Sequence, residues 1–301
     1  MRFYVDECES YKDKKSKIKI KTNKTIMKNY TQAPLPFQGQ KRRFLKPFKE
    51  ALNGFSPTAT YVDLFGGSGL LSHTVKQYYP DANVIYNDFD NYSQRLDNVE
   101  KTNNIIGDLR QILKDYPDAK RIVGDVRYQV IDRLKQEKGF VDFITISSSL
   151  CFSMNYGTTL EHFEKDSLYN NVRQSNYKCD GYLEGVNRVK KDYRDLFAEY
   201  RNHNNVVFLV DPPYLSTDTT TYNRTDYWKL TDYLNVLKVL EDTSYFYFIT
   251  SNKSQIIELC DWMENNGYCK NPFDDSTTVT IGAQLTHNAK YNDIMIYKNN
   301  D

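Results

Sequence analysis

The sequence predicts an α/β fold in which a mainly parallel sheet is covered by helices and interrupted by one inserted, loop-rich segment. Short apolar runs typical of buried strands alternate with helical patterns, which is the arrangement expected of a parallel sheet. The alternation fails between residues 152 and 182, where Asn, Tyr, Ser and Gly dominate. At 301 residues, the chain is long enough for one large domain or two smaller ones.

The first three strands are expected in the N-terminal half. Residues 61–65 form the first strand, which leads through a glycine-rich turn into a helix. Residues 83–86 form the second strand, and a polar helical stretch follows it. Residues 121–123 form a short third strand, followed by a helical pattern.

The remaining strands are expected in the C-terminal half. Residues 206–210 and 245–249 are continuous apolar runs, which predict buried strands. Residues 277–281 and 293–297 are expected to pair as a terminal antiparallel hairpin and to bring the sheet to seven strands. Residues 183–203 are expected to be helical and charged.

We divide the chain into a basic N-terminal arm (residues 1–31), a main domain in two segments (residues 32–146 and 201–301) and an inserted region (residues 147–200). The arm is best interpreted as a solvated, partly disordered segment. A polyanion is the alternative ligand for its lysines and for the cations that follow, because binding would release counterions. These residues are Lys12, Lys14, Lys15, Lys17, Lys19, Lys21, Lys24, Lys28, Lys41, Arg42, Arg43 and Lys46.

Composition excludes several classes of protein. The net charge of +1 neither demands nor excludes nucleic acid as a ligand. No run is apolar and long enough to span a membrane, and the first residues lack the apolar stretch of a secretory signal. The five cysteines contain no Cys-x-x-Cys pair and the four histidines are scattered. We therefore expect reduced thiols, no metal site and a cytoplasmic location.

The most informative motif is Asp211-Pro212-Pro213-Tyr214, which closes the apolar run at residues 206–210. The two prolines restrict the turn, so that the carboxylate and the tyrosine ring are held with little freedom. Such a turn is suited to a flat group that carries an amine, with ring against ring and the NH₂ pointing at oxygen acceptors. On these four residues alone, an ordinary strand-ending turn is an equally good interpretation.

A second motif predicts a nucleoside pocket. The turn Gly66-Gly67-Ser68-Gly69 joins a strand to a helix and lets a ligand approach the backbone closely. Asp88 ends the next strand about 20 residues later, which is the interval typical of a carboxylate that binds ribose hydroxyls. Asp90 is the alternative ribose ligand. Together these features resemble an adenosine site at the carboxyl edge of a parallel sheet.

The glycine turn narrows the choice of ligand. It lacks the third glycine of the dinucleotide fingerprint and the Gly-Lys-Ser/Thr of a P-loop, so NAD and nucleoside triphosphates fit poorly. S-adenosylmethionine, a nucleoside without pyrophosphate, fits better. Asp63 would face its sulfonium or amino group, Phe89 would cover the adenine and Asp125 would meet the adenine amine. Phe89 as a core ring and Asp125 as a helix N-cap remain alternatives.

With Asp211–Tyr214 added, the ordered motifs over residues 33–298 resemble the Dam-like (alpha) group of N6-adenine DNA methyltransferases. The resemblance implies a Rossmann-like class I fold that depends on S-adenosylmethionine, with an inserted target-recognition region. The segment Pro36–Arg42 is similar to the family's first cofactor motif, and residues 63–69 match its cofactor loop. The cofactor contacts that these two motifs imply are Phe37, Gly39, Lys41, Asp63, Phe65, Gly66, Gly67, Ser68 and Gly69, with Asp211 completing the site.

The resemblance also implies a mechanism and a substrate. Asp211 and the carbonyl of Pro212 would accept the two N–H bonds of an adenine amine, Tyr214 would stack on the base, and the base would be flipped out of duplex DNA. Residues 147–200 would contact the DNA, and a cognate restriction endonuclease is a candidate partner. The residues suited to phosphates or base edges there are Asn155, Arg173, Arg188, Lys190 and Lys191.

Several other functions share parts of this pattern. The same turn serves cytosine-N4 in DNA or an adenine in RNA, and a non-catalytic DNA-binding relative would keep the fold. A glutamine-modifying protein methyltransferase usually carries Asn in place of Asp211. A C5-cytosine enzyme needs a Pro-Cys nucleophile, and no cysteine here follows a proline. A Rossmann oxidoreductase is disfavoured by the incomplete dinucleotide fingerprint.

Overall fold

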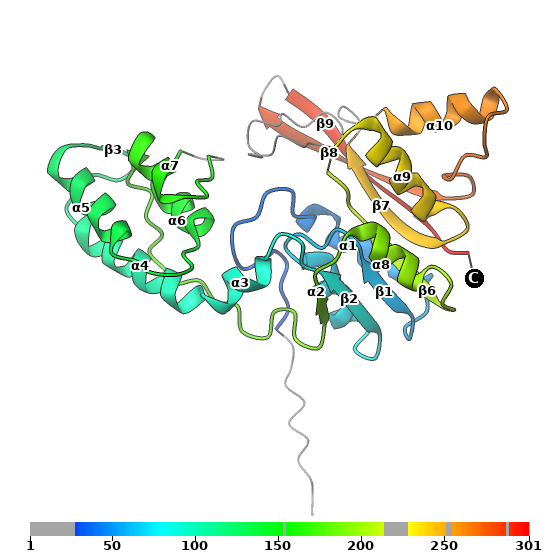
Figure 1. Ribbon diagram of the computed structural model, residues 1–301, viewed down its shortest axis with the longest axis horizontal. Coiled ribbons are helices and arrows are strands. Elements are labelled where there is room, and N and C mark those ends of the chain that lie inside the picture. Colours follow the sequence, from blue (N-terminus) through cyan, green and yellow to red (C-terminus); the bar gives the residue numbers. More distant parts are fainter. Residues whose placement is uncertain (1–27, 153–154, 214–227, 251–254, 287–288, 301) are drawn as a thin grey trace, which may run out of the picture.

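A seven-stranded sheet forms the centre of the computed structural model, which describes residues 28–152, 155–213, 228–250, 255–286 and 289–300. The first five strands in the sheet run parallel, whereas the last two form an antiparallel hairpin (Figure 1). In spatial order they are β5 (Asn187–Val189), β2 (Asn83–Asn87), β1 (Thr60–Asp63), β6 (Val206–Val210), β7 (Ser244–Thr250), β9 (Ala289–Lys298) and β8 (Thr277–Thr286).

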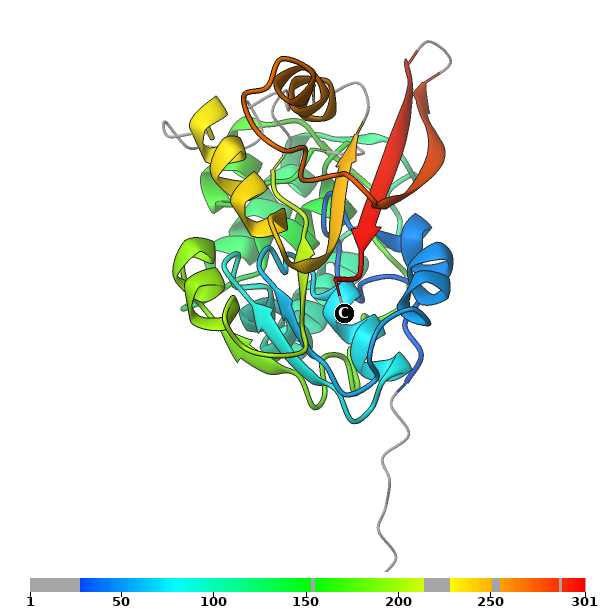
Figure 2. The same ribbon diagram turned by 90° about the vertical axis from the view of Figure 1, so that its right-hand side faces the viewer.

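Helices cover both faces of this sheet (Figure 2). A 3₁₀ turn, η1 (Arg42–Phe44), leads into α1 (Leu45–Leu52), and α1 packs with α2 (Leu70–Tyr78) on one face. The opposite face is covered by α8 (Tyr193–Tyr200), α9 (Leu230–Leu240) and α10 (Ile256–Asn265).

The position of β6 at the centre of the sheet explains why this strand is apolar at every position. Val207 and Leu209 pack toward α1 and α2, whereas Phe208 and Val210 pack toward the helices of the other face. Because alternate side chains of a strand point to opposite faces, a strand covered on both sides needs apolar residues throughout. The seven strands, the parallel arrangement and the terminal hairpin confirm the fold predicted from the sequence.

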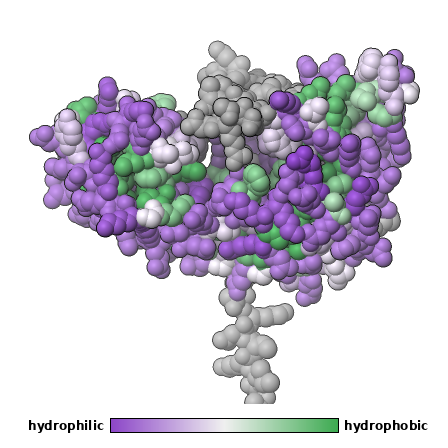
Figure 3. All heavy atoms as spheres, viewed as in Figure 1, coloured by the Kyte–Doolittle hydropathy of each residue, from purple (hydrophilic) through white to green (hydrophobic). Residues whose placement is uncertain are grey.

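A second lobe stands beside the β5 edge of the sheet (Figure 1). Its apolar core includes Ile105, Ile146 and Phe163, and continues into Tyr86 and Tyr92 at the base. Hydrophilic residues cover most of the face seen in Figure 3, over both lobes. The elements from the base outward are α3 (Tyr92–Asp97), α4 (Val99–Ile112), β3 (Arg121–Ile122), α5 (Gly124–Lys135), α6 (Phe143–Leu150), α7 (Leu160–Lys165) and β4 (Leu168–Tyr169).

The predictions for the third strand and for the bounds of the inserted region are wrong. Residues 121–123 are not the third strand of the main sheet, because β3 pairs with β4 in a separate antiparallel pair within the second lobe. Residues 187–200 do not belong to the inserted region, because they contain β5, which pairs with β2, and α8, which packs on the sheet. The insertion therefore lies between β2 and β5.

The buried side chain of Arg95 joins the lobe to the sheet domain. The guanidinium of Arg95 donates to Asp142 at 3.0 Å, to the Thr145 hydroxyl at 3.0 Å and to the carbonyl of Pro36 at 2.8 Å. The Asp142 carboxylate also accepts from the N–H of Thr145 and so caps α6. One side chain thus connects α3, α6 and the segment that precedes η1.

Replacing Arg95 with Met should lower the free energy of unfolding by about 3–5 kcal/mol, because the buried Asp142 carboxylate would lose its counterion. Arg188→Met is the matched control, since Arg188 is exposed and lies 3.9 Å from Asp97. That change should cost about 0–1 kcal/mol. Denaturant unfolding of both variants measures the difference, and equal losses would contradict a structural role for Arg95.

Candidate active site at the carboxyl edge of the sheet

The glycine-rich turn between β1 and α2 is shaped by close packing against β2. A Cβ atom on Gly66 would lie 2.2 Å from the ring of Tyr86, so only glycine fits there. The Tyr86 hydroxyl donates to the carbonyl of Gly67 at 2.7 Å. On the outer side, the ring of Phe37 lies against Gly67. The turn is therefore held between two aromatic rings.

The return segment of the second lobe supports the same turn. The Tyr182 hydroxyl donates to the carbonyl of Ser68 at 2.8 Å, and the side chain of Leu183 fills the space beside Gly69. Gly69 and Leu183 both have left-handed backbone, with φ of 72° and 60°, a conformation that is costly for a leucine. Tyr182 and Leu183 were not predicted as site residues, and the only local signal for them is the flanking glycines at 181 and 185.

Asp63 ends β1 beneath this turn and is almost completely buried. Its Oδ2 accepts from the Ser72 hydroxyl at 2.6 Å, whereas its Oδ1 makes no hydrogen bond to the described residues. Burial raises the pKa of Asp63 to about 7, and the charge of Asp211 adds to the rise. The Ser72 hydroxyl, the nearby N–H of Phe65 and Lys41 act in the opposite direction.

Asp211 ends the neighbouring strand β6 and forms an ion pair with Lys41, at 2.5 Å from Nζ to Oδ2. The Lys41 side chain is 9% exposed and also donates to the carbonyl of Gly39 at 2.9 Å. Burial raises the pKa of Asp211, and Asp293 adds to this, whereas Lys41 lowers it. The structure therefore brings Lys41, Asp63 and Asp211 into one buried charge cluster.

Asp88 and Phe89 follow β2 at the same edge. The Asp88 carboxylate accepts from the N–H groups of Tyr92 and Ser93, at 2.6 and 2.9 Å, and from the Tyr86 hydroxyl at 3.1 Å. It therefore orders the start of α3, although two carboxylate oxygens have room for a further donor. The side chain of Phe89 is 47% exposed, which is unusual for a ring of this size.

Of the other residues predicted to belong to the site, some lie at the carboxyl edge of the sheet and others do not. The ring of Phe65 packs on Tyr193 at 4.9 Å. Pro212 is buried and Pro213 is exposed, and Tyr214 lies outside the described residues. Asp125 is exposed in the first turn of α5 in the second lobe, because β3 does not join the main sheet. Its predicted contact with the cofactor is therefore wrong.

The strand that pairs with the outer side of β2 is β5 rather than β3, and the end of β5 lies beside Asn87. The amide of Asn87 donates to the carbonyls of Leu64 and Lys191, and its oxygen accepts from the Lys191 N–H, all at 3.0 Å. The next residue, Asp192, accepts from the N–H of Arg194 and caps α8. An aspartate just before a helix was the available sequence signal.

The five predicted DNA contacts form two separate groups. Asn155 and Arg173 are exposed in the second lobe, where Arg173 lies over the ring of Tyr177 at 4.4 Å. Arg188, Lys190 and Lys191 lie on β5 and just after it. Lys190 donates to Asn91 at 2.6 Å, and Lys191 pairs with Glu199 at 2.5 Å.

The described residues contain no group of three or more His, Cys, Asp or Glu side chains able to hold a metal ion. None of their helices combines the length and apolar character needed to cross a membrane.

Comparison with known proteins identifies methyltransferases. The model of the D12 class N6 adenine-specific DNA methyltransferases matches residues 37–270. A Haemophilus influenzae protein described as "Putative methyltransferase" is 36% identical over 283 residues, which cover 90% of this chain and 93% of that protein. The matched span contains the glycine turn, the second lobe and Asp211.

The raised pKa of Asp63 predicts a loss of stability as pH rises. In the unfolded chain, the carboxyl of Asp63 has its ordinary pKa of 3.8 and is ionised above that pH. In the folded protein, the same carboxyl keeps its proton up to a pH of about 7. The stabilising contribution of the protonated group is therefore full below about pH 4 and is lost by about pH 7. Asp63→Asn stays neutral and keeps an acceptor for Ser72. Over this pH range, the free energy of unfolding of the variant should therefore fall by roughly 2–4 kcal/mol less than that of the wild type.

Denaturant unfolding of the wild type and Asp63→Asn across this pH range measures the difference. Parallel stability curves for the two proteins would mean that Asp63 is ionised throughout and would contradict the raised pKa.

Proposed function

The chain belongs to the D12 class of N6 adenine-specific DNA methyltransferases, and we propose that it transfers a methyl group from S-adenosylmethionine to the N6 amine of an adenine in duplex DNA. The observation that carries this proposal is the meeting of the glycine turn and Asp211 at the ends of the adjacent strands β1 and β6. In an open parallel sheet, ligands bind outside the carboxyl ends of the strands.

The residues at this edge suit S-adenosylmethionine, which supplies an electrophilic methyl group on a sulfonium when bound. The buried Oδ1 of Asp63, which has no hydrogen-bond partner among the described residues, would accept from the amino group of its methionine part. Lys41 would bind the carboxylate of the same part. Asp88 would take the ribose hydroxyls, and the exposed ring of Phe89 would cover the adenine.

Asp211 would act on the target amine by hydrogen bonding. Its carboxylate and the carbonyl of Pro212 would accept the two N–H bonds, so that the nitrogen becomes pyramidal and its lone pair points at the methyl group. Asp211 is bound to Lys41 in the structure. If Lys41 turns to the cofactor carboxylate, the charge on Asp211 becomes available to the amine. We assign stacking on the flipped base to Tyr214.

The second lobe is our candidate for target recognition. Its exposed Asn155 and Arg173 would contact bases or phosphates, and Arg188, Lys190 and Lys191 would contact phosphates at its base. An enzyme of this kind would work on DNA in the cytoplasm, and a cognate restriction endonuclease is a partner that the proposal accommodates.

Asp211→Ala should abolish methyl transfer and leave cofactor binding within about threefold, because Asp211 is assigned to the amine rather than to the cofactor's main contacts. The measurement is transfer of labelled methyl groups to unmethylated duplex DNA, followed by nucleoside analysis. N6-methyladenine is the expected product of the wild type. Label in N4-methylcytosine would move the substrate to cytosine.

Two control variants make this test sharper. Asp211→Asn keeps the shape of the side chain and a carbonyl oxygen that can accept one N–H bond, but it loses the negative charge, so it should keep only part of the activity. Asp195→Asn, at an exposed position on α8, should keep full activity. Full activity of Asp211→Ala would remove Asp211 from the mechanism.

Cofactor binding should release a proton from Asp63. At pH 6, Asp63 with a pKa of about 7 is mostly protonated, whereas the amino group of the free ligand, near pKa 8, already carries its proton. Contact between the two would ionise Asp63, so up to about 0.9 protons should be released per ligand bound. Titration calorimetry in two buffers of different ionisation enthalpy measures this number.

Asp63→Asn is the control for the calorimetric test, and it should release none of these protons. A wild type that binds the cofactor at pH 6 without proton release would show that Asp63 does not face the amino group.

A further inference from the structure

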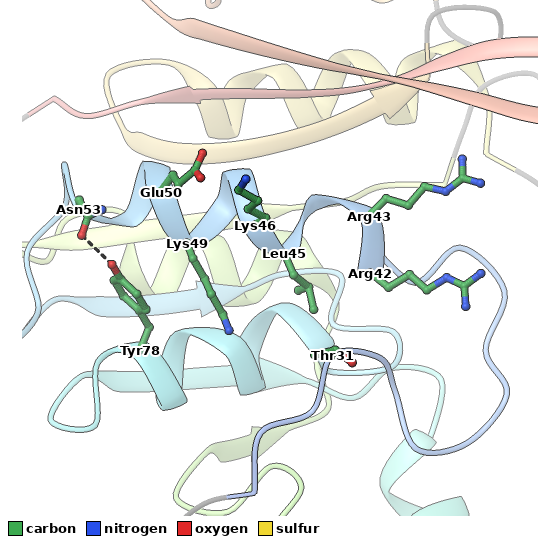
Figure 4. A pocket seen from close by; sticks show the side chains of 9 residues that line it. All are labelled: Thr31, Arg42, Arg43, Leu45, Lys46, Lys49, Glu50, Asn53 and Tyr78. Carbon is green, nitrogen blue, oxygen red and sulfur yellow. Dashed lines mark hydrogen bonds between the residues drawn. The ribbon is translucent and has the colours of Figure 1, made fainter.

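A cavity of about 450 Å³ lies on the side of the sheet domain, between η1–α1 and the end of α2 (Figure 4). Four cationic side chains line it: Arg42, Arg43, Lys46 and Lys49. The Tyr78 hydroxyl donates to Asn53 at 2.7 Å and closes its far end. We call this cavity the α1 groove.

The positive charge of the α1 groove is not balanced within the described residues. None of its four cations forms an ion pair there, and Glu50 is the one acidic residue in its lining. Arg42 and Arg43 lie in the turn before α1, and Lys46 and Lys49 lie on α1 itself, so an anion in the groove would meet four cations and one carboxylate.

The position of the groove connects it to the candidate active site. Arg42 follows Lys41, whose ammonium touches Asp211, and in Figure 4 the side chains of Arg42 and Arg43 extend together beyond the start of α1. From there α1 leads away from the carboxyl edge along the face opposite α9 and α10. Eight residues of helix span about 12 Å, which is several phosphates of a DNA strand.

We propose that the α1 groove binds the phosphate backbone of the substrate duplex outside the target site. The inference rests on the proposed function and adds a contact on the sheet domain to the contacts expected from the second lobe. A duplex is favoured over a membrane surface because the described lining offers cations and a hydroxyl, without an exposed Leu, Phe or Trp to enter a lipid layer.

The test compares two duplexes that carry the methylation site. One has about one helical turn of flanking DNA, about 10 base pairs, on each side, and the other is trimmed to about half a turn. For the double variant Lys46→Gln/Lys49→Gln, the slope of log affinity against log salt should fall by about 2 on the long duplex. On the short duplex the slope and the rate at saturating DNA should match the wild type.

Lys238→Gln/Lys270→Gln is the matched control, because both lysines are exposed and lie on the side of α9 and α10. It removes the same charge and should leave both slopes unchanged. Equal slopes for the groove variant and the wild type would overturn the proposal, as would an equal loss in the control.

Two further outcomes separate this proposal from its alternatives. If the groove variant loses binding to phosphatidylserine vesicles but keeps its DNA slope, the groove serves a membrane and the proposal is wrong. If the wild type binds the duplexes but methylates neither, the proposed function fails, while the salt slopes still decide whether the groove binds DNA.

Discussion

The buried charge cluster of Lys41, Asp63 and Asp211 is the constraint on which the rest of the structure depends. Lys41 pairs with Asp211, and the buried Asp63 carboxyl lies in the field of both charges, which is unfavourable unless one of the two acids keeps its proton. Asp63 is the acid that does so, because its pKa is raised to about 7. The cluster exists only because β1 and β6 are neighbours in the sheet and the segment before η1 crosses their ends.

The base of the second lobe is tied to the same region at both of its ends. Where the chain enters the lobe, the Tyr92 hydroxyl accepts from the N–H of Leu35 at 3.0 Å and donates to its carbonyl at 3.1 Å. Where it leaves, Tyr182 and Leu183 hold the glycine turn. A movement of the lobe would therefore shift the glycine turn, which is the backbone expected to bind the cofactor.

The parts of the fold that could be predicted are those with a strong local pattern. The strands β6 and β7 are buried on both faces, so β6 is apolar throughout and β7 is apolar between its terminal Ser244 and Thr250. By contrast, β5 is a three-residue edge strand with exposed Asn187 and Arg188. Asp125 was misassigned because the short strand before it has the same local pattern whichever strand it pairs with. The residues Tyr182 and Ser68 are 114 positions apart in the sequence, and no local pattern predicts a contact between residues so far apart.

The placement of the insertion between β2 and β5 has a consequence for how such proteins diversify. Its entry and exit lie at one corner of the sheet, next to an edge strand, so the length and content of the lobe can change without altering the register of the central strands. Such changes would have to keep Arg95, Tyr182 and Leu183, because these residues connect the base of the lobe to the sheet domain. If the lobe recognises the target as proposed, specificity for a new sequence can be acquired by exchanging the part of the lobe beyond these residues.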